Sequence, residues 1–442
     1  MASRARDPRL GAGQGARVID AIPAGDAARR IQAEVRPQPP LRMPLDDALG
    51  CVLAEPVVSP LDIPPHTNSA MDGYAVRGED VRGATTEAPK LLRVVESIAA
   101  GAFPTRALGS GECARIFTGA TLPQGADSVI RQEDTDQGSQ VITVFKDRDV
   151  GVNFRLAGED IRRGDTVLQA GTELGPAHLG VLASLAVADP VVYRRPRVAI
   201  LGSGDEIVDV DQPDEILSGR KIASSNTHTL VALVKQAGGI PVNLGIARDT
   251  PESLREHLAR ARDCDLLVTT AGISVGEHDH LRAAIAELGG KLLFWKLRMR
   301  PGAPVGFGLL PTFRQSDLPT LPWIGLPGNP VSVMVTFELF VRPAIRRMMG
   351  HDRPFRRAVR VRAAEPIRVG ARLQHFLRAV VTEAADGPVA HLTGPQGSGI
   401  LTSMVKANTL LVLPEGQHET PAGATVDALR LDDPVHQEEP GF

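Results

Sequence analysis

Between Arg197 and Gly350, strand-like apolar stretches alternate with helix-like stretches, and this alternation constrains the fold more than any other feature. Strands alternating with helices build a mostly parallel sheet covered by helices on both faces. The sequence therefore predicts an α/β domain at 196–350. Its predicted strands lie at 198–201, 265–270 and 323–326, and its predicted helices at 226–238, from 250, at about 279–288 and at 331–349.

The rest of the 442-residue chain is predicted to add smaller modules, so that the whole is an α/β multidomain protein. Helices are expected at 17–35, 44–54 and 176–188, whereas 77–158 and 351–435 show short β patterns. The predicted modules are a disordered tail (1–16), an elongated helical and extended N-terminal module (17–66 and 159–195), an inserted β-rich module (67–158) and a small β-barrel-like C-terminal module (351–442).

Composition excludes several classes of protein. The net charge of −3 gives no electrostatic footprint for nucleic acid, and no apolar run reaches membrane-spanning length. The first 15 residues lack the apolar segment of a secretory signal. Cys51, Cys113 and Cys264 fit no zinc spacing, so a reduced, cytoplasmic protein is expected.

Three polar, glycine-bearing loops follow three of the predicted strands, at 202–206, 271–279 and 327–332. In a parallel sheet, such loops emerge at the carboxyl edge, where ligands bind. Free backbone N–H groups and helix N-termini there favour an anion. None of the loops matches GxGxxG or the Walker pattern, which disfavours dinucleotide-dependent dehydrogenases and P-loop enzymes. The sequence therefore predicts an anion site at this edge.

Acidic residues recur in predicted loops, and the segment Asn68–Val76 (NSAMDGYAV) places Asp72 before Gly73. We expect Gly73 to let the backbone approach a ligand closely. Carboxylates beside bound phosphate are what Mg²⁺ requires, because it is a hard cation that takes oxygen ligands. Candidate cationic and hydroxyl partners for an anion are Arg155, Arg298, Arg300, Arg378, Ser274, Ser332 and Ser403.

Eight segments, in family order over about 17–415, resemble the molybdopterin molybdenumtransferases, which include the E domain of gephyrin. They are NSAMDGYAV (68–76), IFTGATLPQGAD (116–127), NFRLAGEDIRRGD (153–165), ILGSGDEIV (200–208), AGISVGEHD (271–279), MRPGAPVGFG (299–308), LPGNPVSVMVTFELFVRP (326–343) and GSGILTSMVKAN (397–408).

The resemblance implies four modules, an elongated homodimer and a reaction in which adenylylated molybdopterin and molybdate give molybdenum cofactor and AMP, with Mg²⁺. It also implies contact with a molybdopterin adenylyltransferase and with molybdoenzyme maturation factors. By position it implies catalytic roles for Asp72, Thr118, Glu206 and Asp265, with Asp72, Glu206 and Asp265 as metal ligands. The implied cofactor-binding residues are Arg155, Asp160, Gly272, Ser274, Gly276, Arg300, Gly328, Asn329, Ser332, Arg378 and Ser403.

This chain departs from the family pattern at two positions. Ala303 stands where the loop usually carries a second cation, and Ala271 replaces a glycine. The first departure predicts weaker oxyanion binding unless Arg298 supplies the charge. Two alternatives to the enzyme therefore stay open: a catalytically weak paralogue that carries or scaffolds the pterin nucleotide, and a related nucleotide-processing or tungstate-selective variant.

Overall fold

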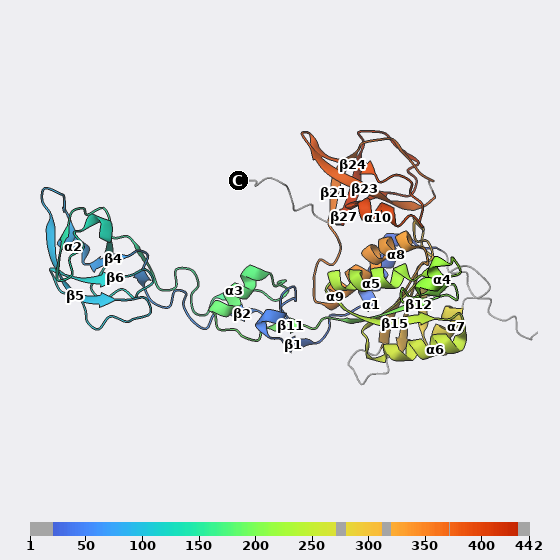
Figure 1. Cartoon of the computed structure of the whole chain (residues 1–442), viewed down its shortest axis with the longest axis horizontal. Helices are drawn as coiled ribbons and strands as arrows, with labels where there is room; N and C mark the ends of the chain where they lie inside the picture. Colours follow the sequence, from blue (N-terminus) through green and yellow to red (C-terminus); the bar gives the residue numbers. More distant parts are fainter. Residues whose placement is uncertain (1–20, 271–279, 312–319, 371, 432–442) are drawn as a thin grey trace, which may run out of the picture. The chain divides into compact units, whose positions relative to one another are not determined.

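The computed structural model describes residues 21–270, 280–311, 320–370 and 372–431 (Figure 1). The chain divides into two compact units. One, here called the α/β unit, holds the residues up to Leu41, Gly50–Val52 and everything from Val192 onward. The other, here called the β-rich unit, holds Arg42–Leu49 and Leu53–Val191. In the part of the chain described, no helix is long and apolar enough to cross a membrane.

A six-stranded sheet with strand order β15-β12-β16-β20-β19-β17 forms the centre of the α/β unit. β15, β12, β16 and β20 are mutually parallel, whereas β19 runs antiparallel to both of its neighbours. The mostly parallel sheet expected from the sequence is thus present. The strands are β12 (Arg197–Ser203), β15 (Ile240–Ala247), β16 (Leu266–Thr270), β17 (Lys291–Phe294), β19 (Gly306–Pro311) and β20 (Thr320–Leu326).

Both faces of this sheet are buried under helices. Successive side chains of a strand point to opposite faces, so each strand contributes residues to two core clusters. In β12, Val198 and Ile200 join one core cluster, while Ala199 and Leu201 join the other. The first cluster packs under α1 (Ala24–Glu34), α5 (Ser225–Gln236), α8 (Pro330–Thr336), the π-helical η4 (Phe337–Val341) and α9 (Arg342–Met348). The second packs under α6 (Pro251–Ala259) and α7 (His280–Glu287).

The C-terminal strands close on themselves. β23 pairs with both β24 and β25, and β21 and β27 complete the ring, so five strands form the predicted barrel-like module. β18 adds to β23 from outside the ring. These elements are β18 (Met299–Arg300), β21 (Ala358–Ala363), β22 (Ile367–Arg368), β23 (Gln374–Ala384), β24 (Gly387–Leu392), α10 (Thr402–Lys406), β25 (Thr409–Leu413), β26 (Glu419–Thr420) and β27 (Thr425–Arg430).

The β-rich unit contains a five-stranded sheet with order β7-β4-β6-β5-β8. Two short strands outside this sheet, β3 (Asn68–Ser69) and β9 (Phe154–Arg155), pair with each other. In the sequence, β3 precedes the first strand of the sheet and β9 follows the last. The sheet strands are β4 (Gly73–Val76), β5 (Lys90–Ile98), β6 (Glu112–Ile116), β7 (Ser128–Arg131) and β8 (Val141–Val144). Its other elements are η1 (Leu45–Asp47), β2 (Val57–Val58), α2 (Gly78–Val81), η2 (Gln132–Asp134), β10 (Thr166–Leu168) and α3 (Pro176–Ser184).

The structure corrects two predictions for the first 60 residues. Instead of a helix over 44–54, only the 3-10 turn η1 forms, because Gly50 adopts the left-handed conformation (φ +73°) that ends a helix. Helix α1 buries Ala27 and Ile31 in the core of the α/β unit, although the sequence placed it in the N-terminal module. The remaining short elements are β1 (Pro40–Arg42), β11 (Val191–Tyr193), β13 (Ile207–Val208), α4 (Pro213–Leu217), β14 (Ile222–Ala223) and η3 (Arg260–Asp263).

Candidate functional site

A cleft of about 570 Å³ opens at the carboxyl ends of β12, β16 and β20. Two of the three predicted loops line it, through Gly202, Glu206, Gly328 and Asn329. The helices α5 and α8 begin at the same place, so their N-terminal N–H groups and positive dipole ends add to an anion-attracting edge. The third loop carries Gly272, Ser274 and Gly276 and lies outside the described residues.

Asn226 connects the end of β16 to the loop after β20 through hydrogen bonds at the floor of this cleft. Its Nδ2 donates to Thr270 Oγ1 (3.1 Å) and to the Gly328 carbonyl (2.7 Å), and Thr270 Oγ1 donates to the Pro327 carbonyl (3.1 Å). Asn226 Oδ1 is buried and accepts no hydrogen bond from the residues that the structure describes. The sequence places Asn226 only at the start of a predicted helix, because the partners of an amide two strands away cannot be read from spacing.

Glu206 reaches the cleft because Gly204 leaves room for it. Gly204 has φ +136°, and a Cβ built on it would stand 2.8 Å from the Glu206 carboxylate. On the other side of this turn, a second polar cavity of about 670 Å³ is lined by Asp205 and Asp209, among others. The amide of Asp249, just after β15, donates to Asp205 Oδ1 (3.4 Å). Sequence reasoning missed Asp249, although it follows a strand of the same sheet.

Arg378 is a buried cation without an acidic partner among the described residues. Its Nε donates to Ser403 Oγ (3.1 Å) and one terminal nitrogen donates to the Gly397 carbonyl (3.0 Å). Its other terminal nitrogen, Nη1, is buried and has no hydrogen-bond partner in the described part of the chain. Burial lowers the pKa of the guanidinium. An unpaired buried donor on a cation is costly, so this group is suited to receive an anion.

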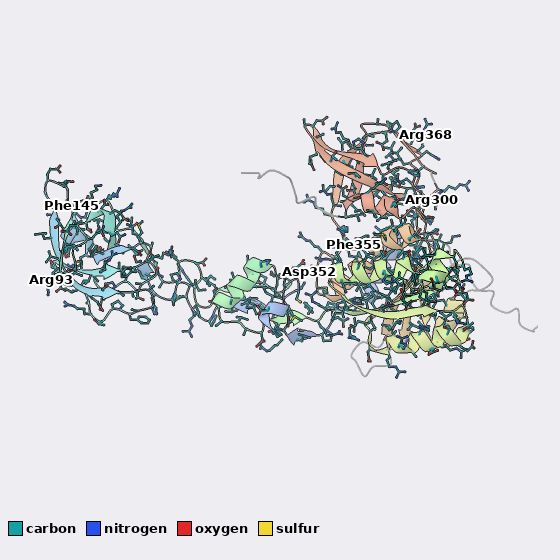
Figure 2. All side chains as sticks on the ribbon, viewed as in Figure 1. Arg93, Phe145, Arg300, Asp352, Phe355 and Arg368 are labelled. Carbon is teal, nitrogen blue, oxygen red and sulfur yellow. The ribbon has the colours of Figure 1, made fainter. Side chains whose placement is uncertain are left out.

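The loop whose Gly397 carbonyl accepts from Arg378 also contacts the rim of the cleft. The Val331 amide donates to the Ser398 carbonyl (3.1 Å), and Asn329 Nδ2 donates to Ser398 Oγ (3.0 Å). Ser332 is buried at the start of α8, whereas the Arg300 side chain is exposed at the end of β18 (Figure 2). The structure thus connects Asn329 with the Arg378 group and leaves the Arg300 side chain on the surface.

In the β-rich unit, Asp72 and Thr118 form one hydrogen-bonded pair. Asp72 Oδ1 accepts from the Thr118 amide and from the Thr118 hydroxyl, both at 2.8 Å. The amide first, and then the hydroxyl, lowers the pKa of the Asp72 carboxyl. The prediction was that Gly73 lets a ligand approach closely, but the structure gives packing as the reason for this glycine: a Cβ would collide with the Ile130 carbonyl of the neighbouring strand. Asp72 is therefore an exposed, readily ionised carboxylate on a tightly packed turn.

Arg155 and Asp160 belong to the same unit. Arg155 is exposed in β9, opposite Asn68 of β3, and the Ala70 amide donates to the Asn153 carbonyl (2.9 Å). Asp160 is also exposed, and its amide donates to the Ile63 carbonyl (3.1 Å). β9 thus pairs with the segment that leads to Asp72, whereas Asp160 lies five residues beyond the end of β9.

Asp265 is not part of the cleft. It precedes β16 at the amino end of the strand, whereas the cleft lies at the carboxyl ends. Its carboxylate accepts from both terminal nitrogens of Arg194 (2.8 and 2.9 Å) and from the Arg197 amide (2.7 Å). The prediction of a catalytic and metal-binding role is corrected, because the sequence shows that an acid adjoins a strand but not which of its neighbours neutralises it.

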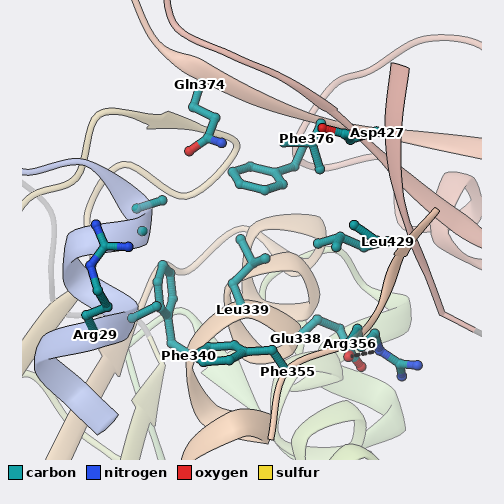
Figure 3. Close-up of a pocket in the computed structure, with 15 residues that line it drawn as sticks. Arg29, Glu338, Leu339, Phe340, Phe355, Arg356, Gln374, Phe376, Asp427 and Leu429 are labelled. Carbon is teal, nitrogen blue, oxygen red and sulfur yellow. Dashed lines mark hydrogen bonds and ion pairs between the residues drawn. The ribbon is translucent and has the colours of Figure 1, made fainter. Parts of the chain in front are cut away.

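A third cavity, of about 370 Å³, lies between α1, η4 and the C-terminal strands (Figure 3). Phe340, Phe355 and Phe376 give it mainly apolar walls, and an ion pair joins Arg356 Nε to Glu338 Oε2 at 2.6 Å on one side. The residues predicted from the sequence lie outside it. Its chemistry is unlike that of the polar cleft at the sheet edge.

Comparison with known proteins gives concordant results along the chain. Residues 22–186 match the MoeA N-terminal region (domain I and II), residues 199–347 a probable molybdopterin binding domain, and residues 360–431 the MoeA C-terminal region (domain IV). A molybdopterin molybdenumtransferase from Nostoc sp. is 38% identical over 87% of each chain. Molybdopterin molybdenumtransferase 2 from Mycobacterium tuberculosis is 37% identical over 91% of this chain and 98% of its own.

The solved structures agree with this assignment. The crystal structure of a molybdopterin biosynthesis MoeA protein from Pyrococcus horikoshii matches with a TM-score of 0.75 at 28% identity. The match covers 93% of this chain and all of that one. The fold, the cleft at the sheet edge and these relatives lead to one conclusion: the chain belongs to the molybdopterin molybdenumtransferase (MoeA) family.

Proposed function

We propose that this protein is a molybdopterin molybdenumtransferase that inserts molybdate into adenylylated molybdopterin and releases AMP in a Mg²⁺-dependent reaction. The observation that carries the proposal is the polar cleft at the carboxyl edge of the sheet, with Glu206 at its wall and the N-terminus of α5 at its floor. A phosphate-bearing substrate suits a site with free N–H groups, and the nearby carboxylate suits its counter-cation.

The acids present fit Mg²⁺ better than a transition metal. Among the described residues, no group of three or more His, Cys, Asp or Glu side chains is arranged to hold a metal. Mg²⁺ does not need such a cage, because it is commonly held by one or two carboxylates, water and substrate phosphate oxygens. Glu206 of the α/β unit and Asp72 of the β-rich unit are each, taken separately, a candidate carboxylate for Mg²⁺. Bound Mg²⁺ would offset the charge that develops when the phosphoanhydride breaks.

Molybdate, the tetrahedral oxyanion substrate, has its candidate site at Arg378 and Ser403. The unpaired Nη1 of Arg378 can donate to an oxyanion, while Ser403 holds Nε of the same guanidinium. A charge-assisted hydrogen bond of this kind is stronger than one between neutral groups. Arg300, Ser332 and Ser274 remain proposed members of this site, and Asp160 and Arg155 remain proposed contacts for the pterin nucleotide.

The test is AMP release from adenylylated molybdopterin in the presence of molybdate and Mg²⁺. We expect Asp72→Asn and Glu206→Gln to abolish release while leaving circular dichroism unchanged, because each keeps the shape of the side chain and removes its charge. Glu87→Gln, at an exposed position of the β-rich unit, is the matched control and should behave as the wild type. Full turnover after exhaustive EDTA treatment would contradict the proposed role of the acids.

One observation favours the alternative of a catalytically weak carrier. Arg298, which was considered as a substitute for the cation absent at Ala303, is engaged elsewhere: its Nε donates to Glu415 (3.0 Å) and Nη1 donates to the Ala21 carbonyl (2.9 Å). Arg298 therefore does not stand free to bind an oxyanion. Binding of the pterin nucleotide without any AMP release by the wild type would support the carrier function.

A homodimer is also proposed, on the strength of family membership alone. The long apolar segment 331–349 is not available as a dimer surface through its apolar residues, because those such as Val333 and Phe337 are buried in the core of their own unit. A dimer would therefore use other surfaces. Light scattering of the purified protein tests the stoichiometry.

A further inference from the structure

Phe117 is an exposed aromatic ring in the β-rich unit, directly beside the Asp72–Thr118 pair. It follows β6 and precedes Thr118, and 36% of the residue is exposed. Its amide donates to the Ile98 carbonyl (3.3 Å), which fixes the backbone at the carboxyl end of β5. Exposed single apolar residues are common on protein surfaces. Phe117 differs from most of them because its ring is held in place by a cation.

That cation is Arg115, which lies between two aromatic rings. Its guanidinium carbon is 5.0 Å from the centroid of the Tyr74 ring and 4.9 Å from that of the Phe117 ring. The guanidinium donates to the Gly73 carbonyl (2.9 Å) and to Gln132 Oε1 (2.6 Å), so it cannot easily move away. Phe117 is therefore pre-positioned on one side while part of its surface remains open.

Gln132 links this stack to the turn that carries Asp72. The Gln132 amide donates to the Asp72 carbonyl (3.3 Å), and the Gln132 side chain accepts from Arg115. The charge of Arg115 also contributes to lowering the pKa of Asp72. Ring, cation and carboxylate thus form one connected group on a single unit.

We propose that Phe117 is a stacking platform for a fused heteroaromatic ring of the substrate, either adenine or pterin. An aromatic side chain offers a flat apolar face to such a ring, and base–aromatic stacking contributes substantially to affinity. The polar groups beside the platform suit a ring that is attached to phosphate and handled by Asp72. The inference rests on the proposed function and adds a specificity-determining residue to it.

The test is isothermal titration of the full-length protein with AMP and, separately, with neopterin, both in Mg²⁺. We expect Phe117→Ser to raise the dissociation constant of one probe about five- to 150-fold, the range for the loss of one aromatic stack. The weakened probe identifies the ring. Phe117→Trp should bind that probe at least as tightly as the wild type, because it restores an aromatic face.

Leu91→Ser is the matched control, because Leu91 is an apolar residue of the same unit, 67% exposed and near the opposite end of β5. It should bind both probes as the wild type does. The inference is overturned if Phe117→Ser binds both probes normally, or if the wild type binds neither. If the wild type binds AMP through Phe117 but releases none from adenylylated molybdopterin, the proposed function is refuted and the stacking role of Phe117 is still supported.

Discussion

The buried guanidinium of Arg378 makes an energetic prediction that separates an anion site from a structural arginine. In Arg378→Met, two hydrogen bonds of a charged donor are lost, to Ser403 and Gly397, at roughly 1.5–3 kcal/mol each. The variant also relieves the unpaired buried Nη1, whose cost is about 1–3 kcal/mol, and the desolvation of a buried cation, which costs several kcal/mol more. The two effects oppose each other with similar size. Without molybdate, the free energy of unfolding should therefore change by no more than about 1 kcal/mol.

Added molybdate should stabilise the wild type much more than Arg378→Met. At 100 times the dissociation constant, a ligand stabilises the folded protein by about 2.7 kcal/mol. Loss of one charge-assisted hydrogen bond, worth about 1.5–3 kcal/mol, would reduce that gain to roughly 0.3–1.3 kcal/mol at the same concentration. Urea unfolding followed by circular dichroism, with and without molybdate, measures both quantities.

Arg356→Met is the matched control, because the Arg356 side chain is mostly shielded (17% exposed) but is paired with Glu338. Removing it leaves the buried Glu338 carboxylate with the more distant Arg342 (3.9 Å), so we expect a loss of up to about 3–5 kcal/mol. The gain from molybdate should stay the same as in the wild type. A molybdate gain that survives in Arg378→Met, or one that is absent from the wild type, would refute the assignment of Arg378 to the oxyanion.

Three further outcomes are expected. Thr118→Val removes the hydroxyl that helps to lower the pKa of Asp72, so the acid limb of the pH–activity profile should move to higher pH; an unmoved limb would exclude Asp72 as the group that must be ionised. Ala303→Lys should lower the molybdate concentration for half-maximal AMP release. Arg298→Ala should leave that concentration unchanged, since Arg298 is paired with Glu415. No effect of Ala303→Lys together with a higher molybdate requirement of Arg298→Ala would show compensation by Arg298. Asp265→Asn should lower the free energy of unfolding by about 3–5 kcal/mol yet leave turnover of the folded protein intact, because Asp265 is a buried partner of Arg194; lost turnover with normal stability would return it to the site.

The sequence predicts the α/β core well because its signals are local. The Thr250 side chain accepts from the Ser253 amide and Pro251 opens α6, as the cap pattern indicates. The alternating faces of β12 likewise follow from its apolar run. Predictions based on short apolar periodicity alone are weaker: over 44–54 only the 3-10 turn η1 forms, ahead of Gly50, whose left-handed conformation a periodicity count does not register.

The candidate site, too, is only partly predictable from the sequence. The carboxyl edge of the sheet, with Glu206 and Asn329, follows from topology and could be predicted. The unpaired state of Arg378 and the neutralisation of Asp265 by Arg194 could not, because each depends on groups from other strands or loops. Phe117 lies inside the segment 116–127, but nothing in that segment sets it apart, and only the position of Arg115 against its ring distinguishes it.

The strand that carries Arg378 has a further consequence for selectivity. β23 is paired with β18, β24 and β25, so its backbone is among the most constrained in the closed ring of strands. A guanidinium mounted on such a strand has little freedom to follow a ligand of different size. If Arg378 holds the oxyanion, discrimination against the smaller sulfate ion would come from a fixed gap that sulfate cannot span, rather than from a cavity that closes around whichever anion arrives.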